Sequence, residues 1–293
     1  MGFFNISRRT STIIKIKGFI KSILPPFLIE FKRAIERRLD TSPWLEYAPA
    51  GWRTKLTSSE NIGWNSTHAV SIEKVRFPSF CANLEGTGPI AFMHDNPNVS
   101  EMCVPFHNRN ITYAYVLALA AHKKDTLTVL DWGGSLGHNY LIGKALLPHV
   151  TIDFHCKEVP LMVEAGKRLN PDVHWYVDES CLLRTYDLVI MNGVLQYIED
   201  WANTLRRIAP AVNEYLFLGH LPLVNKGPGF VALQRHYGTE MLHEQFNREV
   251  ILQVVEGMGF SLMREFLTGI RPYIKNAPEQ CELYSWLFKK GPK

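Results

Sequence analysis

The sequence predicts an α/β protein whose mostly parallel sheet is closed by an antiparallel hairpin. From residue 126 onward, apolar runs of strand length alternate with helical segments, as is typical of parallel strands joined by right-handed helical crossovers. A glycine-rich loop separates the first of these strands from the next helix, and the last two strands follow each other without a helix. Consecutive strands without an intervening helix favour antiparallel pairing.

Composition indicates one large domain with an appendage. The 293 residues are 46% hydrophobic and 20% charged, enough to bury a full core. The five cysteines are widely spaced and contain no CxxC pair, which argues against a disulfide framework or a zinc knuckle and favours free thiols in a reducing, cytoplasmic compartment. No stretch approaches the roughly 20 apolar residues that span a bilayer. We expect three regions: 1–47, 48–122 and 123–293.

The first region is basic and amphipathic. Residues 11–38 mix isoleucine, leucine and phenylalanine with lysine and arginine, and Pro25 and Pro26 interrupt them, which predicts two short helices joined by a kink. Such helices fit peripheral contact with the anionic inner face of the cytoplasmic membrane. They fit packing on the main domain equally well. The net charge is only +4 and its basic excess is confined to this region, so we expect no nucleic-acid partner.

Residues 48–105 are aromatic and rich in glycine and proline, so we expect a cap or lid of mostly irregular structure. A helix is expected over 111–122. In the main domain we expect strands over 126–130, 150–157, 173–177, 186–191 and 215–218. Helices are expected over 139–147, 160–169, 201–209 and 248–258, and the closing strands over 260–266 and 283–288.

The loop after the first strand has the chemistry of a cofactor site. Asp131 stands at the strand tip, and Gly133, Gly134, Ser135 and Gly137 follow it before the helix. Glycines are needed where backbone turns tightly and approaches a ligand, and a helix N-terminus behind them offers amide donors. Ser135 takes the place of the usual middle glycine. The G-x-G-x-x-G spacing of a dinucleotide-dependent oxidoreductase is absent.

Later strand ends supply further candidate cofactor contacts. Glu158 ends the second strand, 27 residues after Asp131, where a carboxylate accepts hydrogen bonds from both hydroxyls of a ribose. Asp178 follows the third strand, at a place suited to an adenine amino group. Asn192 and Gly193 follow the fourth strand, at the carboxyl edge of the sheet where α/β proteins bind ligands.

Several segments together resemble class I methyltransferases, and in particular a bacterial methyltransferase family associated with surface-polysaccharide gene clusters. They are VLDWGGSLG, HCKE, YDLVIMNGVLQYIEDW, GFVALQRH and the terminal hairpin, and the resemblance spans roughly Trp52 to Lys289. It implies a Rossmann-like fold with a seven-stranded sheet, S-adenosyl-L-methionine as methyl donor, and a sugar or glycan intermediate as acceptor. Family membership alone does not settle activity.

Catalysis of methyl transfer depends mostly on alignment, with a base added when the acceptor is an alcohol. His220, Tyr197 and His236 follow the fourth and fifth strands and are the candidate bases, and Gln196 and Arg235 are candidate positioning groups. His220 closes the strand YLFLGH, so we prefer it, although an ordinary loop histidine remains the alternative. The scattered histidines show no metal spacing, so we expect no metal ion.

Two other functions stay open. The first is an NAD(P)-dependent oxidoreductase on a similar sheet, and the second is a catalytically inactive methyltransferase-fold partner of polysaccharide enzymes. Sequence does not identify the methyl acceptor, its accepting atom or the oligomeric state, because acceptor pockets come from the lid and from loops after the later strands.

Overall fold

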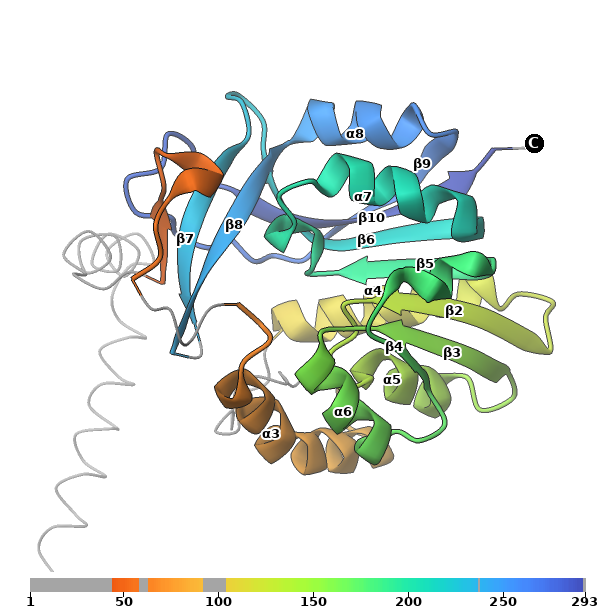
Figure 1. Ribbon diagram of the computed structural model, residues 1–293. Helices are drawn as coiled ribbons and strands as arrows, with labels where there is room; N and C mark the ends of the chain where they lie inside the picture. Colours follow the sequence, from red (N-terminus) through yellow and green to blue (C-terminus); the bar gives the residue numbers. More distant parts are fainter. Residues whose placement is uncertain (1–43, 58–62, 92–103, 237, 292–293) are drawn as a thin grey trace, which may run out of the picture. The chain divides into compact units, whose positions relative to one another are not determined.

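The computed structural model describes residues 44–57, 63–91, 104–236 and 238–291 (Figure 1). Almost all of the predicted basic region 1–47, with its two helices, lies outside these residues, so its proposed membrane contact stays a prediction. No helix in the described part of the chain is long and apolar enough to cross a membrane.

Seven strands form the predicted sheet. Their bounds are β2 (Thr126–Trp132), β3 (Thr151–Lys157), β4 (His174–Tyr176), β5 (Tyr186–Asn192), β6 (Val212–Val224), β9 (Phe260–Leu267) and β10 (Glu282–Lys290). The order β4-β3-β2-β5-β6 is parallel throughout. Strand β10 lies antiparallel beside β6, and β9 pairs antiparallel with β10. The predicted Rossmann-like α/β fold, with a mostly parallel sheet and a closing antiparallel hairpin, is therefore confirmed.

Three further strands extend this sheet and were not predicted. They are β1 (Leu45–Tyr47), β7 (Phe230–His236) and β8 (Thr239–Asn247). Strands β7 and β8 form an antiparallel hairpin, and β1 pairs with the outer side of β7. The end of β8 runs parallel to the end of β6, where Leu223 pairs with Phe246, so the whole sheet has ten strands.

Helices cover both faces of the parallel strands. They are α4 (Val104–Ala120), α5 (His138–Leu146), α6 (Pro160–Leu169), α7 (Trp201–Ile208) and α8 (Arg248–Glu256), with the short 3₁₀ helices η1 (Gly51–Arg53), η2 (Glu179–Leu183), η3 (Leu195–Tyr197) and η4 (Ala209–Ala211). Along β5, Leu188 and Ile190 pack with side chains of α4 and α5, whereas Val189 and Met191 pack with those of α7 and α8. Alternation of this kind makes a covered parallel strand apolar on both faces.

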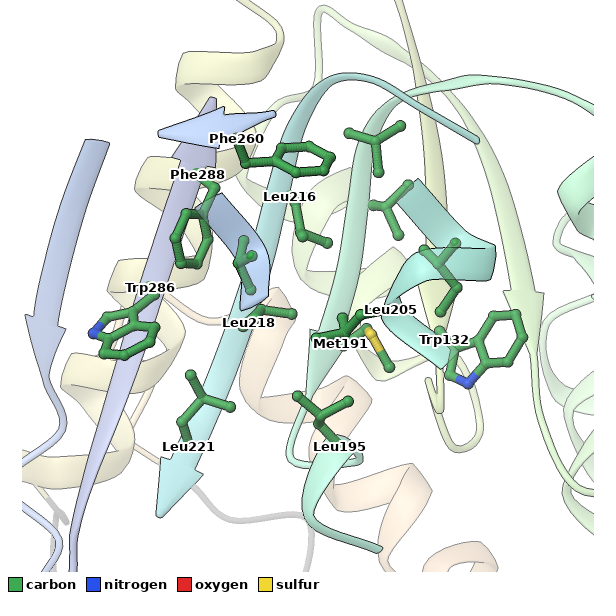
Figure 2. Packing of buried hydrophobic residues seen from close by; sticks show 14 of the residues in the cluster. Trp132, Met191, Leu195, Leu205, Leu216, Leu218, Leu221, Phe260, Trp286 and Phe288 are labelled. Atoms are coloured by element: carbon green, nitrogen blue, oxygen red, sulfur yellow. The ribbon is translucent and has the colours of Figure 1, made fainter. Parts of the chain in front are cut away.

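The cluster beneath α7 and α8 ties the closing hairpin to the parallel strands (Figure 2). Trp286 of β10 is fully buried in it together with Phe288 and Leu218. The Trp286 indole nitrogen donates a 2.7 Å hydrogen bond to Glu265 of β9. A buried indole needs such a partner, so this bond also holds the hairpin together.

One expectation about the cap was wrong. Residues 67–85 form a 19-residue helix, α3 (Thr67–Glu85), and not irregular structure. The Ser66 hydroxyl accepts a hydrogen bond from the Ala69 amide at the helix start, and Ala69, Val70 and Phe77 pack with side chains of α6. The burial of these side chains thus offsets the helix-disrupting effect of Pro78, which lies inside the helix and lacks an amide donor. Helix α4 also begins seven residues earlier than the predicted position 111, at Val104.

Candidate active site

A cavity of about 530 Å³ lies at the carboxyl ends of β2, β5 and β6. This edge is where open α/β sheets bind ligands. The lining includes nine of the predicted cofactor contacts and candidate bases: Gly133, Gly134, Ser135, Glu158, Asn192, Gly193, Tyr197, His220 and His236. Side chains of α3, α4 and the β1-β7-β8 extension complete the walls.

The glycine loop is held in conformations that few residues adopt. Gly133 and Gly137 have φ angles of 83°, and Ser135 has a φ of 52°. A positive φ is uncommon outside glycine and is costly for an L-residue. The Gly133 amide donates to the Lys157 carbonyl at 2.8 Å, and the Asn170 side chain donates to the Leu136 carbonyl at 2.6 Å. These bonds hold the loop against the end of β3 and the end of α6.

Asp131 lies beneath the loop and outside the cavity lining. It is fully buried, and its Oδ2 accepts a 2.9 Å hydrogen bond from the side-chain amide nitrogen, Nδ2, of Asn139. Burial raises the pKa of Asp131 to about 7, with a smaller contribution from the charge of Glu158 and an opposing one from the Asn139 hydrogen bond. The residue predicted to contact cofactor therefore supports the loop from below.

Glu158 faces the cavity beside the loop. Its Oε1 accepts a hydrogen bond from the Ser135 amide at 3.0 Å, and its Oε2 accepts one from the Val159 amide at 2.6 Å. Burial raises the pKa of this carboxyl, while both amide hydrogen bonds lower it. Each carboxylate oxygen has a second lone pair that can accept a further hydrogen bond. Two hydroxyls of a ribose match that capacity.

The remaining cofactor candidates divide between the cavity and its surroundings. Asn192 and Gly193 line the cavity at the end of β5. Gly137 lies behind the loop as the N-cap of α5. Asp178 is exposed outside the lining, and its carboxylate accepts hydrogen bonds from the amide and hydroxyl of Ser180. The predicted adenine contact of Asp178 therefore has no support from its position.

An irregularity in β6 directs His220 into the cavity. The pairing of β6 with β10 shifts between Leu218 and Leu221, and His220 itself has a φ of 55°. The His220 amide donates to the Ser285 hydroxyl at 3.2 Å. Bulges of this kind reorient a side chain and often occur beside functional sites.

The lowered pKa of His220 leaves its imidazole uncharged, although it also makes this group a weak base. Burial, with a smaller contribution from the cationic Arg109, lowers the pKa of His220 to about 3. The imidazole is therefore neutral at physiological pH. Its Nε2 is buried and has no hydrogen-bond partner among the described residues. A lone pair is thus available on a cavity-lining imidazole.

The other two candidate bases are already engaged. The Tyr197 hydroxyl donates to Gln234 Oε1 at 2.8 Å, and burial raises the pKa of this phenol. His236 Nδ1 accepts a 3.0 Å hydrogen bond from the Trp44 indole. Of the predicted positioning groups, Gln196 lines the cavity, whereas Arg235 lies outside the lining and contacts Glu46 and Glu240.

Several lining residues were missed by sequence reasoning. Glu73 and Phe80 come from α3, Arg109 from α4, His138 from α5 and His243 from β8. Burial lowers the pKa of His138 and of His243 to about 3, so the cavity wall holds three neutral histidines. Helical spacing of Ala69, Glu73, Phe77 and Phe80 was the available signal for α3.

No protein-family model matches the sequence, and a search of curated proteins finds no match. The bacterial family that the sequence resembles is therefore not confirmed. Among solved structures, the magnesium protoporphyrin IX methyltransferase of Synechocystis, with bound S-adenosylhomocysteine, is 16% identical at a TM-score of 0.47 and covers 74% of this chain and 99% of its own. The N-methyltransferase NodS of Bradyrhizobium japonicum is 14% identical at a TM-score of 0.42 and covers 74% and 99%. The N-terminal domain of EvdMO1 is 13% identical at 0.46 and covers 78% and 100%.

The loop leaves no room for a side chain at Gly134. A Cβ atom there would lie 2.4 Å from Asp131 Oδ2 and 2.7 Å from Cys156 Sγ. We expect Gly134→Ala to lower the free energy of unfolding by about 1–3 kcal/mol, the usual cost of overpacking. Gly88→Ala is the control, because nothing lies within 4 Å of the added atom. Urea unfolding measures both, and equal stability of the two variants would contradict this packing.

Asp131 makes stability depend on pH in an unusual direction. Its folded pKa of about 7 exceeds the ordinary aspartate value of 3.8, so between these values the folded state binds the extra proton and stability falls as pH rises. Asp131→Asn removes this dependence. As the pH rises from 5 to 8, we expect the free energy of unfolding of wild type to fall by about 2–3 kcal/mol relative to that of the variant. Urea unfolding at several pH values tests this, and a constant difference would refute it.

Proposed function

We propose that this protein is an S-adenosyl-L-methionine-dependent methyltransferase that methylates a hydroxyl of a sugar or surface-polysaccharide intermediate. The observation that carries the proposal is one cavity that brings together the glycine loop, the carboxylate of Glu158 and the neutral imidazole of His220. The fold alone would leave the function open.

The cofactor side of the cavity fits an adenosyl ligand. Gly133 and Gly134 present backbone without side chains, so a ligand can approach the loop closely. Glu158 has lone pairs for two ribose hydroxyls, and Asn192 and Gly193 border the same space. When bound, S-adenosylmethionine supplies a methyl group already activated by its sulfonium.

The acceptor side supports an alcohol more than a charged nucleophile. His220 Nε2 would accept the proton of an acceptor hydroxyl, and bound S-adenosylmethionine would supply the methyl group. Arg109 helps to keep the imidazole neutral before the reaction. Proton removal of this kind contributes about 10²–10⁴-fold to a rate.

The composition of the acceptor wall favours a polyhydroxylated molecule. Trp44 and Trp64 give apolar surfaces, and Gln196 and Gln234 give neutral hydrogen-bonding groups. Polar groups of this kind orient a ligand, while aromatic surfaces bury its apolar faces. Gln196 Oε1 is buried without a hydrogen-bond partner among the described residues, so an acceptor hydroxyl would satisfy it.

Two alternatives predict different ligands. An oxidoreductase would bind a nicotinamide cofactor, and an inactive partner protein would bind no adenosyl ligand. The backbone argues against an inactive protein. The positive φ angles of Ser135 and His220 cost free energy, and packing of the fold alone does not require that cost. Placement in the cytoplasm, with the N-terminal region on the membrane, remains part of the proposal.

Cofactor binding gives the first test. We expect Glu158→Ala to weaken S-adenosylhomocysteine binding about 10- to 100-fold, because two charge-assisted hydrogen bonds are lost. Glu164→Ala is the control, since this carboxylate is exposed and its ion-pair partner in the described part of the chain is Arg168 on α6. Isothermal titration measures both. Binding of NADH without binding of S-adenosylhomocysteine would favour the oxidoreductase instead.

Catalysis gives the second test. Methyl-labelled S-adenosylmethionine with a panel of nucleotide sugars identifies an acceptor, and His220→Ala should then lower kcat about 10²–10⁴-fold while leaving cofactor affinity unchanged. His149→Ala is the control, because His149 is exposed in the turn before β3, at the opposite ends of the parallel strands from the cavity. Because the pKa of His220 is lowered to about 3, wild-type kcat should not fall through protonation of this group between pH 8 and pH 5. An unchanged kcat in His220→Ala would exclude it as the base.

A further inference from the structure

A second group of chemically competent side chains lies outside the cavity, on strands β3 and β4. Asp153 and His155 project from the same face of β3, and His174 begins β4 directly beside His155 in the parallel register. Their donor atoms all lie within 4.8 Å of one another. No other group of three such side chains was found in the described part of the chain.

We propose that Asp153, His155 and His174 form a site for a divalent transition-metal ion of the zinc class. Two imidazoles and one carboxylate are a common ligand set for zinc, with water in the remaining position. The sequence offered no metal-binding spacing, because the three ligands come from two strands that only the fold brings together.

The distances match a tetrahedral arrangement. Asp153 Oδ1 lies 3.0 Å from His155 Nε2 and 3.4 Å from His174 Nε2. Ligand bonds of about 2.0–2.1 Å at tetrahedral angles separate neighbouring donor atoms by about 3.3 Å. The two imidazole rings lie nearly parallel, with centroids 4.6 Å apart and an interplanar angle of 24°. The two distances place both Nε2 atoms beside the same carboxylate oxygen, and the exposed His174 ring would turn out of this stacked orientation to direct its lone pair at a shared ion.

Neighbouring groups orient the ligands. The Tyr176 hydroxyl lies 3.0 Å from His155 Nδ1, and zinc-bound histidines usually hydrogen-bond through their second nitrogen in this way. Arg184 lies 3.3 Å from the other oxygen of Asp153, Oδ2. This guanidinium fixes the carboxylate and also opposes a cation, so it limits the affinity of the site.

The two histidines differ in their exposure to solvent. The side chain of His155 is fully buried, whereas that of His174 is 60% exposed. An ion can therefore reach the site from solvent through His174 and replace the hydrogen-bond contact between His155 and Asp153.

The site would stabilise the strand that supports the cofactor loop. Strand β4 has only three residues and pairs with β3 alone. Its Tyr176 carbonyl accepts the Glu158 amide at 3.0 Å, and the neighbouring Trp175 ring packs against Gly137. An ion bridging β3 and β4 would therefore hold both Glu158 and the loop.

The test uses the full chain, treated with EDTA and then titrated with zinc chloride by calorimetry. We expect one-to-one binding that His174→Ala weakens about 100-fold or more and that Tyr176→Phe weakens about 10-fold. His149→Ala is the matched control, because His149 is an exposed histidine that does not belong to the Asp153, His155 and His174 cluster. Cobalt binding should add visible absorption bands in wild type that His174→Ala lacks.

Equal zinc affinity in His174→Ala and His149→Ala would overturn the proposal, as would absence of one-to-one binding at millimolar zinc. If His174→Ala does not fold by circular dichroism, Asp153→Asn replaces it with the same expectation. Zinc should also raise the thermal midpoint of wild type through mass action, and no change in that midpoint at saturating zinc would count against the site.

Discussion

The contact between Gly134 and the carboxylate of Asp131 is the constraint on which the rest of the site depends. The loop can lie close to the strand ends only because no Cβ separates them. Once it lies there, the Ser135 amide reaches Glu158 and the Gly133 amide reaches the Lys157 carbonyl. A single close approach of backbone to side chain thus couples β2 and β3 at the cofactor wall. Removing Asp131 from water is the energetic cost of that arrangement.

The opposite wall depends on a change of partner along β6. As far as Gly219 this strand pairs with β5, whereas Leu223 and Val224 pair with β8. His220 lies between the two regions, where the backbone has a positive φ. A regular strand would continue the alternation of buried side chains and leave no irregular position at the sheet edge. The cavity therefore arises where the parallel sheet ends and the antiparallel extension begins.

Periodicity and motif context predicted the parallel strands, the closing hairpin and most of the cofactor wall. Apolar strands such as YDLVIM are covered on both faces, so their composition alone identifies them. Helix α3 was missed because Pro78 and nearby glycines indicate a loop, although Ser66 is a good N-cap. The contributions of Glu73, Arg109 and His243 to the cavity could not be predicted, because they depend on how α3, α4 and β8 pack around it. Asp178 shows the converse: its chain position was suitable, but its carboxylate caps η2 instead.

The short strand pairing between the β1-β7-β8 extension and the parallel sheet has an evolutionary consequence. This pairing consists of two register positions at the end of β6. Further links are the Tyr197–Gln234 hydrogen bond, the backbone hydrogen bonds between β1 and Lys275, and a buried cluster that includes Leu45, Val224 and Ile274. The extension supplies Trp44, Gln234, His236 and His243 to the cavity but contributes nothing to the glycine loop. Mutations there can accumulate while the opposite wall is conserved in shape. Such a division makes the molecule modular, so a lineage could acquire a new acceptor by exchanging one hairpin.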